Sequence, residues 1–424
     1  MVAASGVSSA PSRLGWLDAL RGGAALAVAL HHASYVYLPS VRVWLKEWFD
    51  PGLFGVLVFF LVSGYIVPAS LERRGSVRGF WIGRFFRIYP LLAVTSLLAI
   101  LPFLLGVLGL RAGLETYSPA TAVLAHMTML QDLLNVPNAM NVLWTLSYEM
   151  AFYLLIVALF VVGGHRRSAP AAVVLTVVAL VAITLTATGL LTGAHAPSAL
   201  LSRTAGTGPV VAVTAAALLV AIAAAVSRRA APRVAGGLLG GLLALVLVSV
   251  NGRISAWEGL IMLATMFAGT AVHRAERGQI TWRAGAAAGG VVLAGALAAG
   301  TWHAAPYGRN AQVVWCGAVV AAAAAFAAAW RLRHRRFPAW ATGLGTISFS
   351  LYLLHPLLLM VATQFLGASG REDAVMGLAA FLVALVAASW ASQRWIEAPA
   401  QRLGRRITRP PARETARQPQ VATT

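Results

Sequence analysis

Residues 52–71 read GLFGVLVFFLVSGYIVPASL, an apolar run without a charged residue. About 18 to 20 such residues in a helix cross the hydrocarbon core of a bilayer. Runs of this kind recur along the 424 residues of the chain, which is 59% hydrophobic and only 11% charged. A soluble fold of this size needs a larger polar surface, with about a quarter of its residues charged. The sequence therefore predicts an all-α fold, a polytopic transmembrane helical bundle.

Twelve apolar segments are predicted to span the membrane. They lie at about 15–37, 52–71, 88–110, 142–163, 171–192, 206–226, 234–251, 257–274, 284–301, 311–330, 343–366 and 374–394. The segments 234–251 and 257–274 are short and close together, so the predicted number is 10–12 spans. Ala, Gly and Val dominate the sixth to tenth segments, and such small residues favour close helix packing in lipid.

Three regions follow from these segments. Residues 1–13 are expected to form a cytoplasmic N-terminal segment, residues 14–400 the transmembrane domain, and residues 401–424 a basic disordered cytoplasmic tail. The first apolar run contains Arg21, which argues against a cleavable signal peptide. The longest connection, from about 111 to 141, has an apolar middle too short to span, and it is expected to be an interfacial or re-entrant piece.

The charge of the chain predicts its orientation. The formal net charge is +20, and the basic residues gather in alternate turns, as the positive-inside rule expects of cytoplasmic loops. Those turns hold Arg73, Arg74, Arg78, Arg84 and Arg87; Arg166 and Arg167; Arg228, Arg229 and Arg233; Arg274, Arg277 and Arg283; Arg331, Arg333, Arg335 and Arg336. The pattern indicates a multi-pass protein of the cell (plasma) membrane with both termini cytoplasmic. The lipid bilayer is then a partner, and nucleic acid is not.

Cysteine and histidine usage gives no sign of a metal site. Cys316 is the single cysteine, so the chain can form no intramolecular disulfide and no cysteine-rich metal centre. The histidines in or near loops lack the spacing of metal ligands. Ser63 does not lie in a Gly-x-Ser-x-Gly elbow, so it is not a candidate nucleophile, and Ser63-Gly64 is expected to serve helix packing.

The first span carries the first candidate site residues. Arg21 and His32 are eleven residues apart, close to three helical turns, so they share one face with Asp18, whereas His31 lies about 100° round. A charge and an imidazole in a span are costly unless they face a polar interior. The alternative is that Arg21 reaches back to the cytoplasmic interface and His32 bonds a neighbouring helix. Their common stripe favours a functional role.

Two arginines at the expected inner start of the third span form a second candidate. Arg84 and Arg87 are one turn apart, and adjacent guanidinium groups suit the binding of phosphates. On spacing alone, simple anchoring by the positive-inside rule is the favoured explanation. Pro90 fits the first turn of a helix, where its missing N–H costs little.

The fourth span adds a carboxylate. It opens with Trp144, Thr145, Leu146, Ser147, Tyr148 and Glu149, and Glu149 lies about two turns inside the expected outer boundary. A carboxylate inside a span needs a partner or takes up a proton, and such acids usually mark a pathway or a reaction. An interhelical hydrogen bond is the purely structural alternative.

The eleventh span places Ser348, Tyr352 and His355 on one face. Pro356 cannot donate to the carbonyl of Tyr352, so the helix is expected to kink beside His355. A freed carbonyl near a histidine suits a polar cavity. A kinked helix with a satisfied histidine remains the alternative.

Five motifs in this order resemble the acyltransferase-3 family of integral membrane O-acyltransferases. The matches are Leu17-Asp18-Ala19-Leu20-Arg21-Gly22 followed by His32, Gly55–Gly64, Arg84-x-x-Arg87 before Pro90, Trp144–Tyr153 around Glu149, and Ser348–His355. The sequence departs from the family pattern at His31, Leu57, Met150 and Phe349, which leaves the acceptor open. The resemblance covers about residues 14 to 400.

The resemblance implies an O-acyltransferase that moves an acyl group, acetyl by expectation, from acyl-CoA to a hydroxyl of a glycan or glycosylated metabolite. Acyl-CoA, expected to be acetyl-CoA, is then a co-substrate, and no metal is expected. The predicted catalytic residues are His32 as general base, Glu149 orienting His32 or the acceptor, and His355. Arg21, Arg84 and Arg87 would hold the coenzyme A phosphates, and Trp144, Ser147 and Tyr352 would contact substrate.

Two other function classes fit parts of the sequence. Twelve spans with buried Arg, Glu and His fit a proton-coupled transporter or exporter, although the halves show no internal symmetry. A scaffold or lipid-binding protein without turnover leaves the buried charges unexplained. The acceptors left open are an exopolysaccharide, a cell-envelope glycan, a glycolipid and a macrolide-like product.

Overall fold

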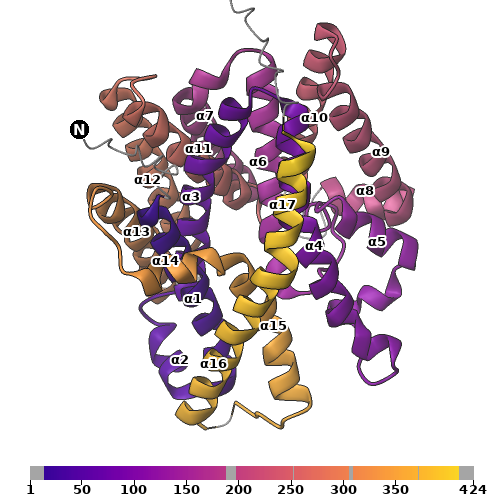
Figure 1. Cartoon of the computed structure of the whole chain (residues 1–424), viewed down its shortest axis with the longest axis vertical. Helices are drawn as coiled ribbons and strands as arrows, with labels where there is room; N and C mark the ends of the chain where they lie inside the picture. The colour runs from indigo at the N-terminus through magenta and orange to yellow at the C-terminus, as the bar shows by residue number, and fades with distance from the viewer. Residues whose placement is uncertain (1–13, 188–196, 252, 305–308, 371, 410–424) are drawn as a thin grey trace, which may run out of the picture.

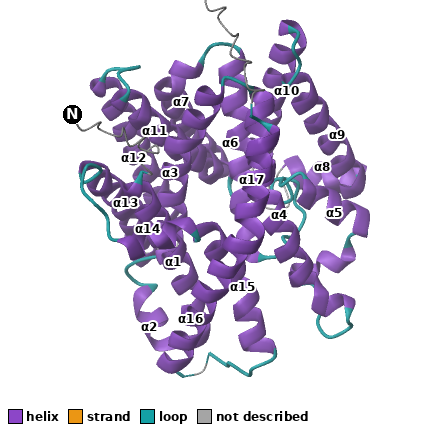
Figure 2. Cartoon of the chain, in the orientation of Figure 1, coloured by secondary structure: helices purple, strands orange, loops and turns teal. Residues whose placement is uncertain are grey.

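Each of the twelve apolar segments coincides with a long helix in the computed structural model (Figures 1 and 2). The structure describes residues 14–187, 197–251, 253–304, 309–370 and 372–409. The long helices are α1 (Gly15–Tyr37), α3 (Pro51–Arg74), α4 (Val77–Leu104), α6 (Trp144–Val161), α7 (Ser168–Ala187), α9 (Thr207–Ala225), α10 (Ala230–Val250), α11 (Ala256–Glu276), α12 (Trp282–Ala304), α13 (Arg309–Arg331), α15 (Ser348–Gln364) and α16 (Val375–Ser392).

Short helices connect the long ones. They are α2 (Pro39–Leu45), η1 (Arg111–Thr116), α5 (Pro119–Met127), η2 (Asn141–Leu143), η3 (His165–Arg167), α8 (Pro197–Ala205), α14 (Ala339–Thr346), η6 (Gln393–Glu397) and α17 (Ala398–Ile407). The described residues contain no strand, so the predicted all-α polytopic bundle is confirmed. Among them, nine helices are long and apolar enough to cross a membrane, and the bent pair α14–α15 makes up to ten.

The two polar long helices lie inside the bundle. α11 packs against α3, α7 and α12, and eighteen of its residues are buried. α1, which carries Arg21 and His32, packs against α3, α14 and α15. The more apolar helices surround them, and this arrangement keeps ionisable side chains away from lipid.

Glycine brings α3 and α11 into close contact. A Cβ added at Gly64 would meet the backbone of Met266, and one added at Gly269 would meet the carbonyl of Leu61. The hydroxyl of Thr270 donates to the carbonyl oxygen of Gly64 at 2.8 Å. The packing role predicted for Ser63-Gly64 is therefore confirmed, since only small residues allow helix backbones to approach this closely.

The structure corrects two predicted boundaries. The side chain of Ser76 caps α4 by accepting from Gly79 N, so the helix begins at Val77 rather than near residue 88. Arg84 and Arg87 therefore lie within the helix. At the other end of the chain, α16 continues through the π-helical η6 into α17, so residues 401–407 are helical and not disordered. Residues 1–13 and 410–424 lie outside the described residues.

The bend near the eleventh segment lies elsewhere than predicted. α14 and α15 meet at an angle of 68° at Ile347, and α15 continues through Pro356 to Gln364. Gly345 lies against the backbone of Asp18, where a Cβ would not fit. The close crossing of α14 over α1 thus accounts for the position of the bend, rather than the proline beside His355.

The connection between α4 and α6 is folded onto the bundle. It consists of η1, α5 and a run of turns in which Leu130, Leu133 and Val136 are fully buried. Asn138 Nδ2 donates to Asp132 Oδ1 at 2.8 Å, and Arg253 Nε lies 3.2 Å from the same oxygen. α5 packs against α9. The segment is thereby held at the entrance of α6, and its interfacial or re-entrant placement stays a prediction.

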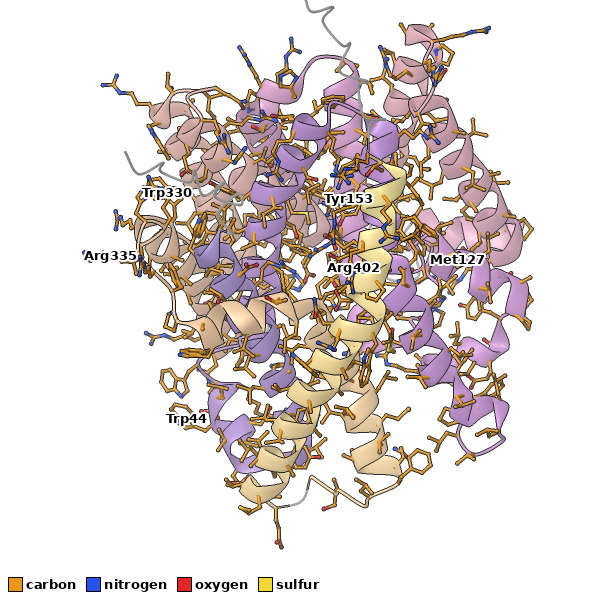
Figure 3. The ribbon with its side chains drawn as sticks, in the orientation of Figure 1. Trp44, Met127, Tyr153, Trp330, Arg335 and Arg402 are labelled. Atoms are coloured by element: carbon orange, nitrogen blue, oxygen red, sulfur yellow. The ribbon has the colours of Figure 1, made fainter. Side chains whose placement is uncertain are left out.

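The two ends of the bundle differ in their side chains. In Figure 3, Trp44 of α2 projects at the lower end, and 63% of its surface is exposed. The turns with the most arginine lie towards the other end, where α4 begins and α17 ends. Arginine concentrated in the turns at one end of a helical bundle is typical of a protein that spans a membrane.

Candidate active site

The site begins where α1 meets α15. His355 Nε2 lies 3.2 Å from His32 Nδ1, and the two rings are 5.1 Å apart at 31°. His355 is fully buried, and its Nδ1 lies 3.1 Å from the carbonyl oxygen of Leu351. His32 Nδ1 is also 3.0 Å from the carbonyl oxygen of Val28. Two histidines predicted from separate motifs thus form one pair.

Two cavities reach His32. The first, named here the histidine cavity, has a volume of about 300 Å³ and is lined among others by His31, His32, Asp50, Trp144, Glu258 and Tyr352. The second, the loop cavity, has a volume of about 750 Å³ and is lined among others by His32, Tyr35, Arg111, Asn141 and Met360. The imidazole of His32 is therefore reachable by a ligand from two directions.

A third cavity lies nearer the arginine-rich end. This arginine cavity has a volume of about 80 Å³, and its polar lining consists of Arg21, Ser63, Arg87, Thr145, Glu149, Ser348 and Tyr352. Arg21 Nη2 donates to Ser348 Oγ at 3.0 Å, and Arg21 Nη1 lies 3.7 Å from Asp18 Oδ1. The cavity therefore presents fixed positive charge to whatever enters it.

Tyr352 forms part of the wall between the arginine and histidine cavities, because it lines both. Its hydroxyl lies 2.8 Å from Thr145 Oγ1 and donates to the carbonyl oxygen of Val142 at 3.1 Å. These contacts tie α15 to the first turn of α6. The ring is thereby held at the boundary between the positively charged cavity and the histidine pair.

Arg84 and Arg87 have different surroundings, which corrects the predicted pair of phosphate ligands. Arg87 lines the arginine cavity, whereas the guanidinium of Arg84 lies 5.4 Å from the ring centre of Tyr153 and 5.5 Å from that of Phe80. Residues three apart on a helix differ by about 60° in direction, enough to separate their environments. Tyr153, labelled in Figure 3, in turn donates to Glu149 Oε1 at 2.5 Å.

Glu149 does not orient His32, contrary to one of the predicted roles. Glu149 lines the arginine cavity with Arg21, and His32 lines the other two. The eleven residues between Arg21 and His32 separate them by about 16 Å along α1. A carboxylate at the level of Arg21 is therefore at a different depth from the imidazole.

Ser147 is a third predicted site residue that the structure places away from its predicted role. It is fully buried and lines none of these three cavities. Thr145 and Glu149 face the arginine cavity, and Ser147 lies two positions from each, about 200° round the helix. Trp144 and Tyr352 do line the histidine cavity, so their predicted contact with substrate stays a prediction.

Sequence reasoning missed several polar residues at the site. Asn141 Nδ2 lies 3.3 Å from His32 Nε2, and Arg111 Nη2 donates to Asn141 Oδ1 at 2.8 Å. His31 Nδ1 lies 3.3 Å from Asp50 Oδ1. The only sequence signal for Asn141 is its place three residues before Trp144. His31 is predicted to lie off the Arg21–His32 face and to depart from the family pattern.

Glu397 is a further buried carboxylate that the predicted spans left out. It closes the π-helical η6 and accepts from Ser350 Oγ at 2.5 Å. Ser350 Oγ also lies 3.0 Å from Ser392 Oγ. Single-turn π-helical insertions often mark functional sites in helices. The sequence could not indicate this one, because the predicted twelfth span ended before it.

Burial dominates the electrostatics of the connection next to the site. It raises the pKa of the Asp132 carboxyl, although Asn138, Arg253 and Arg111 oppose the shift. It lowers the pKa of the Arg111 guanidinium, aided by Arg253. Within the described residues, no group of three or more His, Cys, Asp or Glu side chains is arranged to hold a metal ion.

A family model matches this chain over most of the bundle, and individual proteins match about a third of it. A family model described as "Acyltransferase domain" matches residues 14–202 and 210–394. The acyltransferase MdmB of Streptomyces mycarofaciens is 36% identical over 150 residues, which cover 34% of this chain and 38% of MdmB. The peptidoglycan O-acetyltransferase OatA of Listeria monocytogenes is 26% identical over 152 residues, which cover 33% of this chain and 23% of OatA.

Nodulation protein 10 of Rhizobium leguminosarum is 29% identical over 173 residues, which cover 37% of this chain and 47% of that protein. The chain thus matches less than half the length of each of these relatives. No solved structure matches it. The family model, in contrast, includes α1, α6 and α15, the helices that carry the site, and it extends over both halves of the bundle. The chain therefore belongs to the acyltransferase-3 family.

Proposed function

We propose that this chain is a membrane O-acyltransferase that moves a short acyl group, acetyl by preference, from acyl-CoA to a hydroxyl of a glycan or glycosylated metabolite. The observation that carries the proposal is the pair His32–His355, with its nitrogens 3.2 Å apart, placed beyond a wall shared with the arginine cavity. The names of OatA, a peptidoglycan O-acetyltransferase, and MdmB, an acyltransferase, support the reaction class.

The arginine cavity lies on the proposed path of the donor towards His32. Its volume of about 80 Å³ has room for a few water molecules or a short acyl group, and not for a whole coenzyme. Arg21 and Arg87 would attract the phosphates and polarise nearby oxygens, since guanidinium groups bind phosphate well. The bulk of the coenzyme would then extend towards the arginine-rich end of α4.

The histidine pair supplies the base. Neutral imidazole is the common side-chain base near neutral pH. His32 would take the proton of the acceptor hydroxyl as its oxygen attacks the thioester carbonyl. The carbon–sulfur bond then breaks, and the coenzyme leaves as its thiol after taking up that proton. Neither a serine nor a cysteine intermediate is needed.

His355 would act on His32 rather than on substrate. Its Nε2 faces His32 Nδ1, and its own Nδ1 is held against the carbonyl oxygen of Leu351. A fixed neighbour of this kind orients an imidazole and stabilises the imidazolium that forms during proton transfer. Tyr352 stands at the wall between the cavities, where its ring would line the path of the acyl group.

The proposed reaction has a defined sidedness. The donor end lies at the arginine-rich turns, which the positive-inside rule assigns to the cytoplasm of a plasma-membrane protein with both termini inside. The histidine and loop cavities lie towards the other end of α1. Acyl transfer would then occur across part of the membrane thickness, from a cytoplasmic thioester to an acceptor near the outer face.

The test is acyl transfer by the purified protein in nanodiscs. Radiolabelled acetyl-CoA would be supplied with a panel of glycan fragments, glycolipids and glycosylated macrolides. His32→Ala and His355→Ala are expected to lose activity, by about 10²–10⁴-fold for the general base. His334→Ala, at an exposed position in the turn after α13, serves as the control. Full activity in the folded His32→Ala protein would remove the proposed base.

The transporter reading makes a different prediction. Proteoliposomes would then show proton-driven solute flux without consumption of acetyl-CoA. That result, together with no acyl transfer to any acceptor in the panel, would replace the acyltransferase proposal.

A further inference from the structure

A chain of hydrogen bonds leads from the α4–α6 connection to His32. Arg111 Nη2 donates to Asn141 Oδ1 at 2.8 Å, and Asn141 Nδ2 lies 3.3 Å from His32 Nε2. All three side chains line the loop cavity. The base proposed above is therefore contacted by a residue from outside its own helix and outside the predicted motifs.

The chemistry of Arg111 fixes the orientation of the Asn141 amide. A guanidinium group has donors only, so the atom that it contacts must be the amide oxygen. The amide NH₂ then faces His32, and this group can only donate. Nε2 of His32 must accept, which means that it carries no proton in the resting state.

The same reasoning continues through the histidine pair. With Nε2 bare, the proton of neutral His32 sits on Nδ1, which faces the carbonyl oxygen of Val28 and Nε2 of His355. His355 Nε2 must then accept, so its own proton sits on Nδ1 and is donated to the carbonyl oxygen of Leu351. Every contact from Arg111 to Leu351 then runs in one direction, and one tautomer of each histidine satisfies all of them.

We infer that Asn141, held by Arg111, is a positioning residue that keeps Nε2 of His32 unprotonated and directed into the loop cavity. The inference rests on the proposed function and names the atom and the direction of proton transfer. An acceptor hydroxyl entering from the loop cavity would replace the amide on Nε2 and give its proton to that atom. Once Nε2 is protonated, it and the amide are both donors, so the amide must turn away.

Asn141 lies in the segment 138–142, and contacts on both sides of Asn141 hold this segment in place. Arg111 Nη1 also points to the carbonyl oxygen of Asn138 at 3.5 Å, and Asn138 is bound to Asp132. Asn141 begins η2, and the next residue, Val142, supplies the carbonyl that holds Tyr352. The same segment thus fixes the amide beside the base and the tyrosine at the cavity wall.

Other ionisable groups also face His32 and enter its pH response. They are His31 and Tyr35 on α1, Asp50 at the start of α3, Arg111 in η1, Glu258 on α11, and Tyr352 and His355 on α15. A substitution of Asn141 replaces none of these groups, and among them it alters the hydrogen bond of Arg111. A variant at that position therefore isolates the contribution of the amide.

The test compares pH–rate profiles of kcat/KM for Asn141→Asp and Asn141→Ala with the wild type. An ionised carboxylate only accepts, so Asn141→Asp favours a proton on Nε2. The acidic limb should move to higher pH by about one unit, as expected for a new opposite charge nearby. The rate at neutral pH should fall about 10- to 100-fold, part of what a general base contributes. In Asn141→Ala the rate should fall with a smaller movement of the limb.

Matched controls separate positioning from folding. Asn310→Asp and Asn310→Ala change an exposed asparagine at the start of α13 and should leave both rate and profile unchanged. If Arg111 acts only by holding Asn141, Arg111→Ala and the double variant Arg111→Ala/Asn141→Ala should lose as much activity as Asn141→Ala alone. If the activity losses of the two single variants multiply in the double variant, Arg111 and Asn141 act independently, and the inference is contradicted.

A spectroscopic readout tests the tautomer without turnover. In ¹⁵N-histidine-labelled protein, the resonances assigned to His32 by comparison with His32→Ala should report an unprotonated Nε2. In Asn141→Asp they should report a protonated Nε2. Equal rate losses at all pH values with an unchanged tautomer would overturn the inference, even with His32 still required. Full activity of His32→Ala would instead overturn the proposed function.

Discussion

Arg21 and His32 share one stripe of α1, but they are about 16 Å apart along the helix and line different cavities. Each therefore acquires its own set of partners. Arg21 meets Ser348 and lines a cavity with Glu149, whereas His32 meets His355 and Asn141. The site therefore consists of the arginine cavity and the histidine cavity, and Tyr352 lines both.

The different surroundings of Arg84 and Arg87 lead to a kinetic prediction. Arg87→Ala should raise the KM for the acyl-CoA donor by about 10- to 100-fold, the effect of losing a hydrogen bond to a charged group. Arg84→Ala should change this KM less and lower kcat more, because Arg84 stacks on Tyr153, which bonds Glu149. Initial rates over a range of acetyl-CoA concentrations measure both. Equal effects on KM would restore the predicted pair of phosphate ligands.

A buried carboxyl gives a prediction about pH and stability. The pKa of Asp132 is raised in the folded protein above its usual 3.8, so ionisation disfavours the folded state. As pH rises from about 4 to about 7, the free energy of unfolding of the wild type should fall relative to that of Asp132→Asn.

Melting temperatures of the two proteins in detergent, measured across this pH range, check the sign. The opposite trend, with the wild type gaining stability as pH rises, would mean that the ion pair with Arg253 outweighs burial. At 3.2 Å that pair is close enough to make the comparison informative.

At the scale of elements, close helix contacts fix the geometry of the site. α1 packs on α3, and α3 packs on α11 through Gly64 and Gly269. α14 crosses α1 at Gly345, and the bend that follows directs α15 so that His355 meets His32. The positions of α1 and α15, which carry the histidine pair, therefore depend on close helix contacts at glycines.

A pair of glycine substitutions tests this. Gly64→Ala should destabilise the protein by about 1–3 kcal/mol, because the new methyl group overlaps the backbone of Met266. Gly23→Ala is the matched control: its methyl group meets no atom within 4 Å, and alanine favours a helix over glycine by up to about 1 kcal/mol. Thermal unfolding in detergent measures both. A Gly64→Ala protein as stable as Gly23→Ala would contradict the close contact.

At the scale of the whole molecule, arginine gathers in the turns at one end of the bundle. The donor cavity lies nearer this end, and the loop cavity nearer the opposite end. An enzyme with this layout would take its donor and its acceptor from opposite sides.

Cysteine labelling tests the orientation. Cys316 is the only cysteine, so Cys316→Ala gives a background without thiols. A membrane-impermeant maleimide should label Ser40→Cys, in the first turn of α2, in intact cells. Ala230→Cys, the first residue of α10 after an arginine-rich turn, should react only after permeabilisation. Both positions are exposed. The reverse pattern would invert the proposed sidedness.

The sequence by itself determined that the chain is a bundle of membrane-spanning helices. The length of an apolar run and the placement of arginine are local properties, and they are enough to predict which segments span a bilayer and in which orientation. The sequence also indicated Arg21, His32, Glu149 and His355, since ionisable groups stand out in apolar helices. Only the tertiary structure decided which of these residues meet. His32 contacts His355 and Asn141, Glu149 lines a cavity with Arg21, and Ser147 is buried in the core. Depth along a helix and contact between helices depend on crossings at glycines far apart in the chain, and no local pattern encodes them.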